Sequence, residues 1–293
     1  MDEDAWLADR FEEHRSHLRA VAYRMLGSPT EADDALQDAW LRVSRAGADG
    51  VENLGGWLTT IVARVCLNML RSRTTRREES LEVHIPDPVI SPERGTGPDD
   101  QALLADSVGL ALLVVLDTLT PAERLAFVLH DMFKLPFEEI APVVGRSPAA
   151  ARQLASRARR RVGGAGVPAP DADLARQREV ADAFLRAARE GDFDGLVAVL
   201  DPDVVLRADA GPGRPAASVV LRGAATVAGQ ALRFAAPGQV ARPALVNGAA
   251  GAVVLLGGRP HSVIGFTISG GRIVAIDILA DPERVRRVAA DAL

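Results

Sequence analysis

The chain has 293 residues, of which 48% are hydrophobic and 25% are charged, with a formal net charge of −5 at pH 7. The hydrophobic share excludes a chain that is disordered throughout, and the length predicts two or three domains. Cys66 is the only cysteine, which excludes an internal disulfide and a cysteine-rich zinc site. The N-terminus lacks the pattern of a signal peptide, and no apolar run is long enough to cross a bilayer. We therefore expect a cytoplasmic protein with no membrane partner.

Two amphipathic helices are predicted at the start of the chain. Residues 4–26 carry apolar side chains at helical spacing, and residues 28–31 have the form of a capping box with proline at the first helical position. The second helix exposes a mostly acidic face with one aliphatic side chain, made of Asp33, Asp34, Gln37, Asp38 and Leu41. Such a face is either an ordinary solvated surface or a docking surface for a basic partner.

A third helix is predicted from Trp57 to Arg77, after a glycine-rich loop at residues 46–56. It becomes basic towards its C-terminus, more strongly than the helix dipole requires. We expect phosphate contacts from four of its arginines, namely Arg71, Arg73, Arg76 and Arg77. Residues 78–100 are rich in proline and acidic residues and predict an extended linker, so a first domain ends near residue 77.

A helix–turn–helix unit is predicted near the middle of the chain. Helical periodicity returns at residues 101–119, and residues 120–123 repeat the capping box with proline. Residues 137–162 then predict two helices around a turn at Gly145, with Ser147 capping the second helix. A unit of this kind enters a DNA major groove, and a solvated arginine-rich helix is the alternative.

The outer face of the second helix carries arginine, glutamine and small side chains. The residues predicted to face DNA are Ser147, Ala149, Arg152, Gln153, Ser156, Arg157 and Arg160. Arg152, Gln153 and Arg157 carry forked hydrogen-bond donors that suit base edges, whereas the arginines at residues 159–161 suit phosphates.

The last part of the chain predicts an α+β domain after a second linker at residues 163–173. Three helices are expected at residues 174–190, 193–200 and 223–234. Segments rich in β-branched residues and bounded by glycine-containing turns predict a mostly antiparallel curved sheet, with strands at residues 204–208, 218–221, 240–246, 252–256, 262–268 and 272–279.

The order and spacing of these motifs resemble the extracytoplasmic-function sigma factors of bacterial RNA polymerase. The portion DDALQDAWLR is similar to the face that docks on the clamp helices of the beta-prime subunit. GWLTTIVARVCLNMLRSR resembles the helix that melts and holds the minus-ten promoter element, and residues 119–162 resemble the minus-thirty-five reader. The C-terminal portion ending in VIGFTISGGRIVAIDILADPERV looks like the SnoaL-like cone that is appended to one subgroup.

The resemblance implies two all-α sigma domains, regions 2 and 4, followed by an α+β SnoaL-like domain. The implied division is region 2 at 1–77, a linker at 78–100, region 4 at 101–162, a linker at 163–173 and the SnoaL-like domain at 174–293. The implied partners are core RNA polymerase and promoter DNA, and no cofactor or metal is expected. The implied minus-ten contacts are Asn53, Trp57, Arg64, Asn68, Arg71 and Arg73. In that subgroup the appended domain is thought to set the activity of the factor.

Cone folds of this kind enclose an apolar pocket, where a buried carboxylate or histidine acts as a general base in enzymes. Asp209, His261 and Asp277 are the candidates, and a small ligand is a further candidate partner. A satisfied buried carboxylate is the simpler interpretation, because no nucleophile or metal cluster accompanies them, and we expect no catalysis.

Three functions stay open: a sigma factor modulated by its own third domain, a ligand-sensing repressor that acts without core polymerase, and an isomerase or cyclase with targeting domains. For the first of these we expect the third domain to hold the DNA-binding domains in a closed arrangement.

Overall fold

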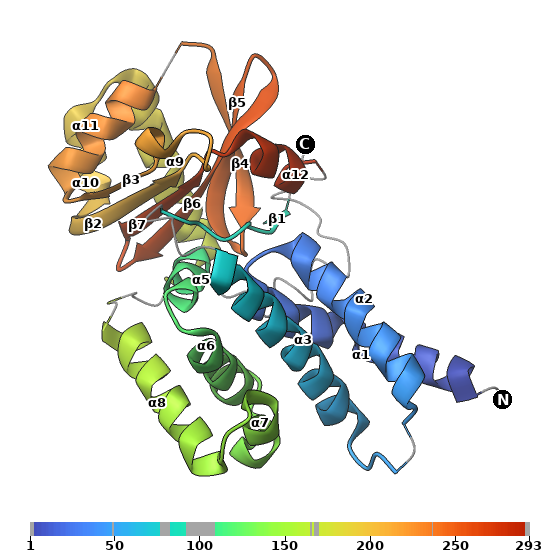
Figure 1. Ribbon diagram of the computed structural model, residues 1–293. Helices are drawn as coiled ribbons and strands as arrows, with labels where there is room; N and C mark the ends of the chain where they lie inside the picture. The colour runs from blue at the N-terminus through green and yellow to red at the C-terminus, as the bar shows by residue number, and fades with distance from the viewer. Residues whose placement is uncertain are drawn as a thin grey trace. The chain divides into compact units, whose positions relative to one another are not determined.

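The computed structural model describes residues 3–48, 50–76, 83–91, 109–164, 166, 170–235 and 237–290. The chain forms two compact units. Unit 1 combines Met1–Ser80 with Val115–Gly166, and unit 2 combines Leu81–Val114 with Val167–Leu293 (Figure 1). No helix in the described part of the chain has the length and hydropathy needed to span a bilayer.

Unit 1 begins with three helices, α1 (Glu3–Leu26), α2 (Pro29–Ala46) and α3 (Leu54–Arg76). The predicted helices are confirmed, but α3 starts earlier than expected, because the Asn53 side chain accepts a hydrogen bond from the Gly56 amide at 3.1 Å and caps the helix. The capping box predicted at Ser28 is wrong. Ser28 makes no side-chain cap, and Glu31 pairs with Arg73 instead.

The remaining elements of unit 1 form the predicted helix–turn–helix region. They are α5 (Leu110–Asp117), which continues from unit 2 into unit 1, α6 (Pro121–Phe127), the short π-helix η1 (Val128–Met132), α7 (Phe137–Val144) and α8 (Pro148–Gly164). The capping box between Thr120 and Glu123 is confirmed, as are the left-handed Gly145 (φ 68°) and the cap at Ser147. The predicted helical residues 101–108 lie outside the described residues.

Arg124 and Phe133 pack this helix–turn–helix region against the N-terminal helices within unit 1. The Arg124 side chain is only 2% exposed, and its Nε donates to the carbonyl of Arg24 at 3.1 Å while Nη1 binds the Asp117 carboxylate at 2.9 Å. The Phe133 ring lies 4.6 Å from the Arg24 guanidinium and 5.1 Å from the His17 ring. Both helical regions therefore share one packed interface.

Unit 2 is built on a seven-stranded sheet in the order β1-β4-β5-β6-β7-β2-β3, in which only β2 and β7 are parallel. The strands are β1 (Ile90–Ser91), β2 (Leu200–Asp209), β3 (Val219–Arg222), β4 (Gln239–Val246), β5 (Ala249–Leu256), β6 (Arg259–Ser269) and β7 (Arg272–Leu279). Six of them follow the predicted segments. The seventh, β1, comes from the predicted linker and pairs with β4.

Helices α9 (Leu174–Glu190), α10 (Phe193–Val199) and α11 (Ala224–Phe234) cover one face of the sheet (Figure 1). Their shared core includes Phe184, Leu196 and Val227 from the helices and Phe266 and Ile276 from the strands. A short 3₁₀ turn lies at Pro215–Ala217, and α12 (Pro282–Val288) follows β7. The last helix was not predicted, although Asp281 and a proline at the first helical position form its start.

Candidate nucleic-acid interface

Helix α8 presents the predicted DNA-facing residues on its outer side. Ala151, Leu154, Ala155 and Ala158 are buried, so the helix has one fixed inner face. The stripe opposite that face repeats at helical spacing and comprises Ala149, Gln153, Ser156 and Arg160. We call these four residues the central stripe. Ser156 is half-buried and the other three are exposed, which makes the stripe available to a groove.

One flank of α8 is held by a carboxylate of α6. Arg157 Nε lies 3.0 Å from Glu123 Oε1, and Arg161 Nη1 lies 3.2 Å from Glu123 Oε2. The Glu123 side chain is 7% exposed, whereas those of Arg157 and Arg161 are 47% and 55% exposed. Burial on its own would raise the pKa of Glu123, but hydrogen bonds from Arg157 and Thr120 and the charge of Arg161 outweigh burial and lower it below 4.5. The carboxylate is therefore charged at neutral pH.

The other flank of α8 rests on η1 and α7. The Arg152 guanidinium lies 5.2 Å above the centre of the Phe137 ring, which stacks on the His130 ring at 3.9 Å. Arg159 Nε lies 2.7 Å from Asp131 Oδ1. Both flanks of the helix are thus bound to the body of unit 1, and the central stripe projects between them.

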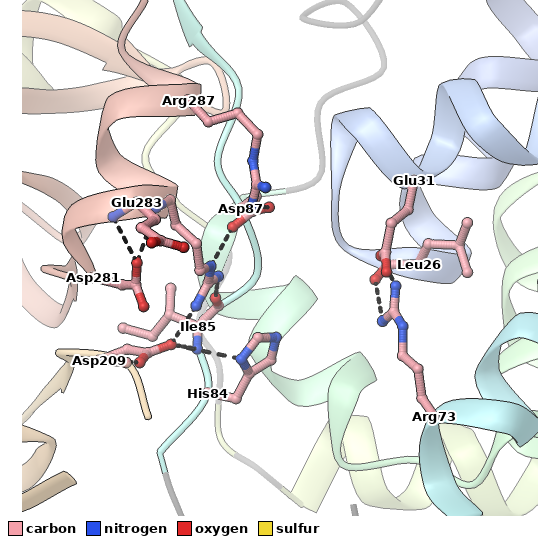
Figure 2. Close-up of polar contacts among 12 residues, drawn as sticks. Leu26, Glu31, Arg73, His84, Ile85, Asp87, Asp209, Asp281, Glu283 and Arg287 are labelled. Atoms are coloured by element: carbon pink, nitrogen blue, oxygen red, sulfur yellow. Dashed lines mark hydrogen bonds and ion pairs between the residues drawn. The ribbon is translucent and has the colours of Figure 1, made fainter. Parts of the chain in front are cut away.

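The predicted minus-ten residues lie along α3 and just before it. Arg64, Asn68 and Arg71 are exposed, and Trp57 is half-buried. Arg73 differs, because its guanidinium donates to the Leu26 carbonyl at 3.0 Å and pairs with Glu31, as Figure 2 shows. Arg73 thereby fastens α3 to the junction of α1 and α2. The side chains of Arg76 and Arg77 lie outside the described part of the chain.

The acidic face of α2 has the predicted composition. Asp34, Gln37, Asp38 and Leu41 are exposed. Asp33 is half-buried and pairs with Arg19 of α1 at 2.7 Å. Asp33 is therefore paired within the region, and the other four residues make up most of the predicted docking surface.

Two of the candidate pocket residues of unit 2, Asp209 and Asp277, lie on the face of the sheet that the helices do not cover. Leu206 and Ala208 pack against the helices, so Arg207 and Asp209, which alternate with them, lie on the opposite face of the sheet. Asp277 lies opposite Arg207 in register on that face and pairs with it at 3.0 Å. Burial raises the pKa of Asp277 despite this neighbour.

Asp209 is likewise buried and pairs with Arg284 of α12, so both carboxylates are satisfied. His261 is exposed at the start of β6. The described residues contain no group of three or more histidine, cysteine or acidic side chains that could hold a metal.

Sequence reasoning missed a cluster in which α12 holds the segment between the two helical regions (Figure 2). Arg284 binds Asp87 with Nε at 2.6 Å and Asp209 with Nη1 at 2.7 Å, and it also donates to the Ile85 carbonyl. The Ile85 amide donates to Asp209 at 3.0 Å. The Val89 amide and carbonyl bind Asn247 at 2.9 and 2.8 Å. We call residues 84–91 the held segment.

The held segment is mostly buried on the sheet. Residues 85–88 and Ser91 are buried, and β1 extends the segment along β4. A strand of two residues gives no sequence periodicity, so composition alone indicated an extended linker. Helix α12, which supplies Arg284, could have been predicted from the aspartate and proline at its start.

A helix–turn–helix unit, a second helical region with a basic helix and an acidic face, and an α+β domain are together typical of a multidomain DNA-binding protein. The family model described as Sigma-70 region 2 matches residues 10–76. The family model described as Sigma-70, region 4 matches residues 109–162.

Two proteins of Mycobacterium tuberculosis strain H37Rv are similar over almost their whole length. The probable ECF RNA polymerase sigma factor SigI is 35% identical over 291 residues, covering 98% of this chain and 96% of the relative. The ECF sigma factor SigJ is 39% identical over 292 residues, covering 94% and 91%. The crystal structure of SigJ aligns with a TM-score of 0.75 at 34% identity, covering 94% of this chain and 97% of that one.

The chain belongs to the extracytoplasmic-function RNA polymerase sigma factors. It carries regions 2 and 4 and a C-terminal SnoaL-like domain, as the sequence predicted. Membership of this family favours the sigma factor over the repressor and enzyme alternatives.

Proposed function

We propose that this sigma factor docks on the clamp helices of core RNA polymerase through the acidic face of α2 and opens the minus-ten element with α3. The central stripe of α8, with Arg152, reads the minus-thirty-five element. The observation that carries this proposal is the bracketing of α8, whose two flanks are bound while its outer stripe stays exposed. Its work with polymerase would take place in the cytoplasm.

The closed packing of unit 1 supports a regulated factor. A compact unit of about 130 residues has a radius of gyration of about 14 Å and thus a diameter of about 36 Å. Elements centred about 25 base pairs apart are separated by about 85 Å at 3.4 Å per base pair. Regions 2 and 4 must therefore separate, breaking the contacts of Arg124 and Phe133, before both can occupy one promoter.

The held segment supports a modulatory role for the C-terminal domain. Residues 84–91 lie between regions 2 and 4 in the chain but belong to unit 2. For as long as Arg284 and Asn247 hold the segment, the chain that joins regions 2 and 4 stays bound to the C-terminal domain, and release would let the helical regions rearrange.

Promoter-dependent transcription tests the sigma function directly. Full-length protein added to core RNA polymerase, with a promoter selected from a random library, is expected to give a run-off transcript of defined start. Asp38→Lys with Leu41→Ala on the exposed α2 face should reduce that transcript, because a basic docking surface would then meet a positive charge. A chain that yields no promoter-dependent transcript, with or without these substitutions, would not act as a sigma factor.

Arg152→Ala is expected to relax base preference at one position of the minus-thirty-five element by about 1–3 kcal/mol. Phe137→Leu keeps an apolar side chain but removes the aromatic face beneath Arg152, so a smaller loss at the same position is expected. Binding to duplexes with single-base substitutions measures both. Arg159→Ala is the control, and it should weaken all of these duplexes equally. A position-independent loss for Arg152→Ala would remove it from the base-reading set.

A further inference from the structure

Glu123 is the third residue of α6 and completes the helix cap. Thr120 Oγ1 donates to Glu123 Oε2 at 2.9 Å, and the Thr120 amide donates to the same oxygen at 3.3 Å. In return the Glu123 amide donates to Thr120 Oγ1 at 3.4 Å. A buried carboxylate in this position has a fixed location, because two groups of its own helix hold it.

The same carboxylate is bound by two arginines of the DNA-reading helix. Arg157 binds one oxygen at 3.0 Å and Arg161 binds the other at 3.2 Å. The two arginines are four residues apart and therefore occupy one flank of α8, one turn apart. The Glu123 carboxylate on α6 thus binds both arginines on this flank of α8.

This arrangement has two physical consequences for DNA binding. A fixed anion between two guanidinium groups resists rotation of α8 about its axis, which keeps the central stripe directed outward. The negative charge also offsets part of the positive charge that attracts phosphates, and phosphate attraction contributes affinity without sequence information.

We propose that Glu123 is a specificity-determining positioning residue of the minus-thirty-five reader. Its carboxylate sets the rotation of α8 and offsets the charges of Arg157 and Arg161. The central stripe and Arg152, rather than phosphate attraction, then decide which DNA is bound. This inference rests on the proposed function and adds the reason why a strongly basic helix discriminates between sequences.

Glu123→Gln in the full-length chain bound to core RNA polymerase tests the proposal. Glutamine is accepted at the third position of a capping box, so the cap is kept while the charge is removed. Affinity for random duplex should rise about threefold to tenfold at 0.1 M salt. The slope of log K against log salt should steepen by about 0.9 for each arginine that gains a phosphate. The ratio of affinities for the selected promoter and random duplex should fall at least threefold.

Two control variants separate charge and rotation from other effects. Thr120→Ala breaks the cap but leaves the carboxylate on Arg157 and Arg161, so melting temperature should fall while salt slope and affinity ratio stay unchanged. Glu138→Gln removes an exposed negative charge from the first turn of α7 and controls for net charge. It should change the salt slope by less than half as much as Glu123→Gln.

Two results would overturn the inference, and a third would refute the proposed function on which it rests. An unchanged salt slope and affinity ratio in Glu123→Gln would make Glu123 a helix cap only. Equal changes in Glu123→Gln and Glu138→Gln would show an effect of net charge alone. Wild-type holoenzyme that fails to distinguish the selected promoter from random duplex would instead refute the proposed function, which the wild-type measurement reveals before any variant is compared.

Discussion

Replacing Arg284 with methionine is expected to destabilise the binding of residues 84–91 by about 3–5 kcal/mol. The substitution leaves two buried carboxylates, Asp87 and Asp209, without the cation that binds both, and it removes the donor to the Ile85 carbonyl. Truncating one partner of a buried ion pair is costly mainly because the other partner stays buried and charged. The methionine side chain keeps most of the apolar volume of arginine, so the loss of binding reflects the missing charge rather than a cavity.

Hydrogen exchange measures this loss where fluorescence cannot, because the three tryptophans, Trp6, Trp40 and Trp57, all lie in unit 1. Peptides covering the amides of Ile85 and Val89 should exchange about two to four orders of magnitude faster in the variant. Run-off transcription by the same variant should differ from wild type if the held segment restrains the helical regions.

Arg287→Met supplies a matched control on the same helix. Arg287 lies 3.3 Å from Asp87, but its side chain is 51% exposed, so its removal should cost less than about 1 kcal/mol and leave transcription unchanged. Unchanged exchange at Ile85 and Val89 in Arg284→Met would contradict the assigned role of the arginine. Faster exchange with unchanged transcription would separate the structural role of the cluster from the proposed regulation.

Arg124→Met is expected to loosen region 4 from region 2 and to lower the free energy of unfolding of unit 1 by about 3–5 kcal/mol. The wild-type guanidinium bridges the Asp117 carboxylate and the Arg24 carbonyl, so the variant leaves the charge of Asp117 and a backbone acceptor of α1 without that donor. Urea unfolding followed by tryptophan fluorescence reports on unit 1 and measures the change.

Two further variants distinguish the loss of stability from the separation of regions 2 and 4. Asp117→Asn keeps an acceptor for Arg124 and should cost about 1 kcal/mol, without separating the regions. Phe133→Ala removes the ring that contacts Arg24 and His17, so it should separate the regions at little cost to the core of region 4. Distances between spin labels on α2 and α8 should lengthen in Phe133→Ala and Arg124→Met. Unchanged distances in both would contradict a closed packing that these residues hold.

Local sequence signals predicted the helical regions well, because their determinants are short-range. The threonine, proline and glutamate at residues 120–123 form a helix cap through contacts within four residues, and the positive φ of Gly145 favours glycine at that position. The inner stripe of α8 was likewise readable from helical spacing, which also identified its exposed side. At Ser28 the predicted helix start is confirmed but the side-chain cap is not, because Glu31 pairs with Arg73, which is distant in the sequence.

Pairing between charges distant in the sequence could not be predicted, because it depends on which helices meet. Periodicity placed Arg157 on the outer side of α8 but did not reveal the carboxylate of Glu123, 34 residues earlier, beneath it. Alternation placed Asp277 among apolar residues but did not indicate which face of the sheet the helices cover. The composition of residues 84–91 indicated a linker, because no feature of the nearby sequence indicates that Arg284 binds them.

The sequence by itself determined the family, the order of the domains, the helix–turn–helix unit and the exposed stripe of its second helix. These follow from backbone propensities, caps and hydrophobic period, which act within a few residues. Only the tertiary structure decided which arginines of that helix are bound by carboxylates of unit 1, and that residues 84–91 belong to unit 2, where Ile90–Ser91 form a strand of its sheet. Both depend on contacts between side chains far apart in the chain, which form only when the helices and strands that carry them pack together.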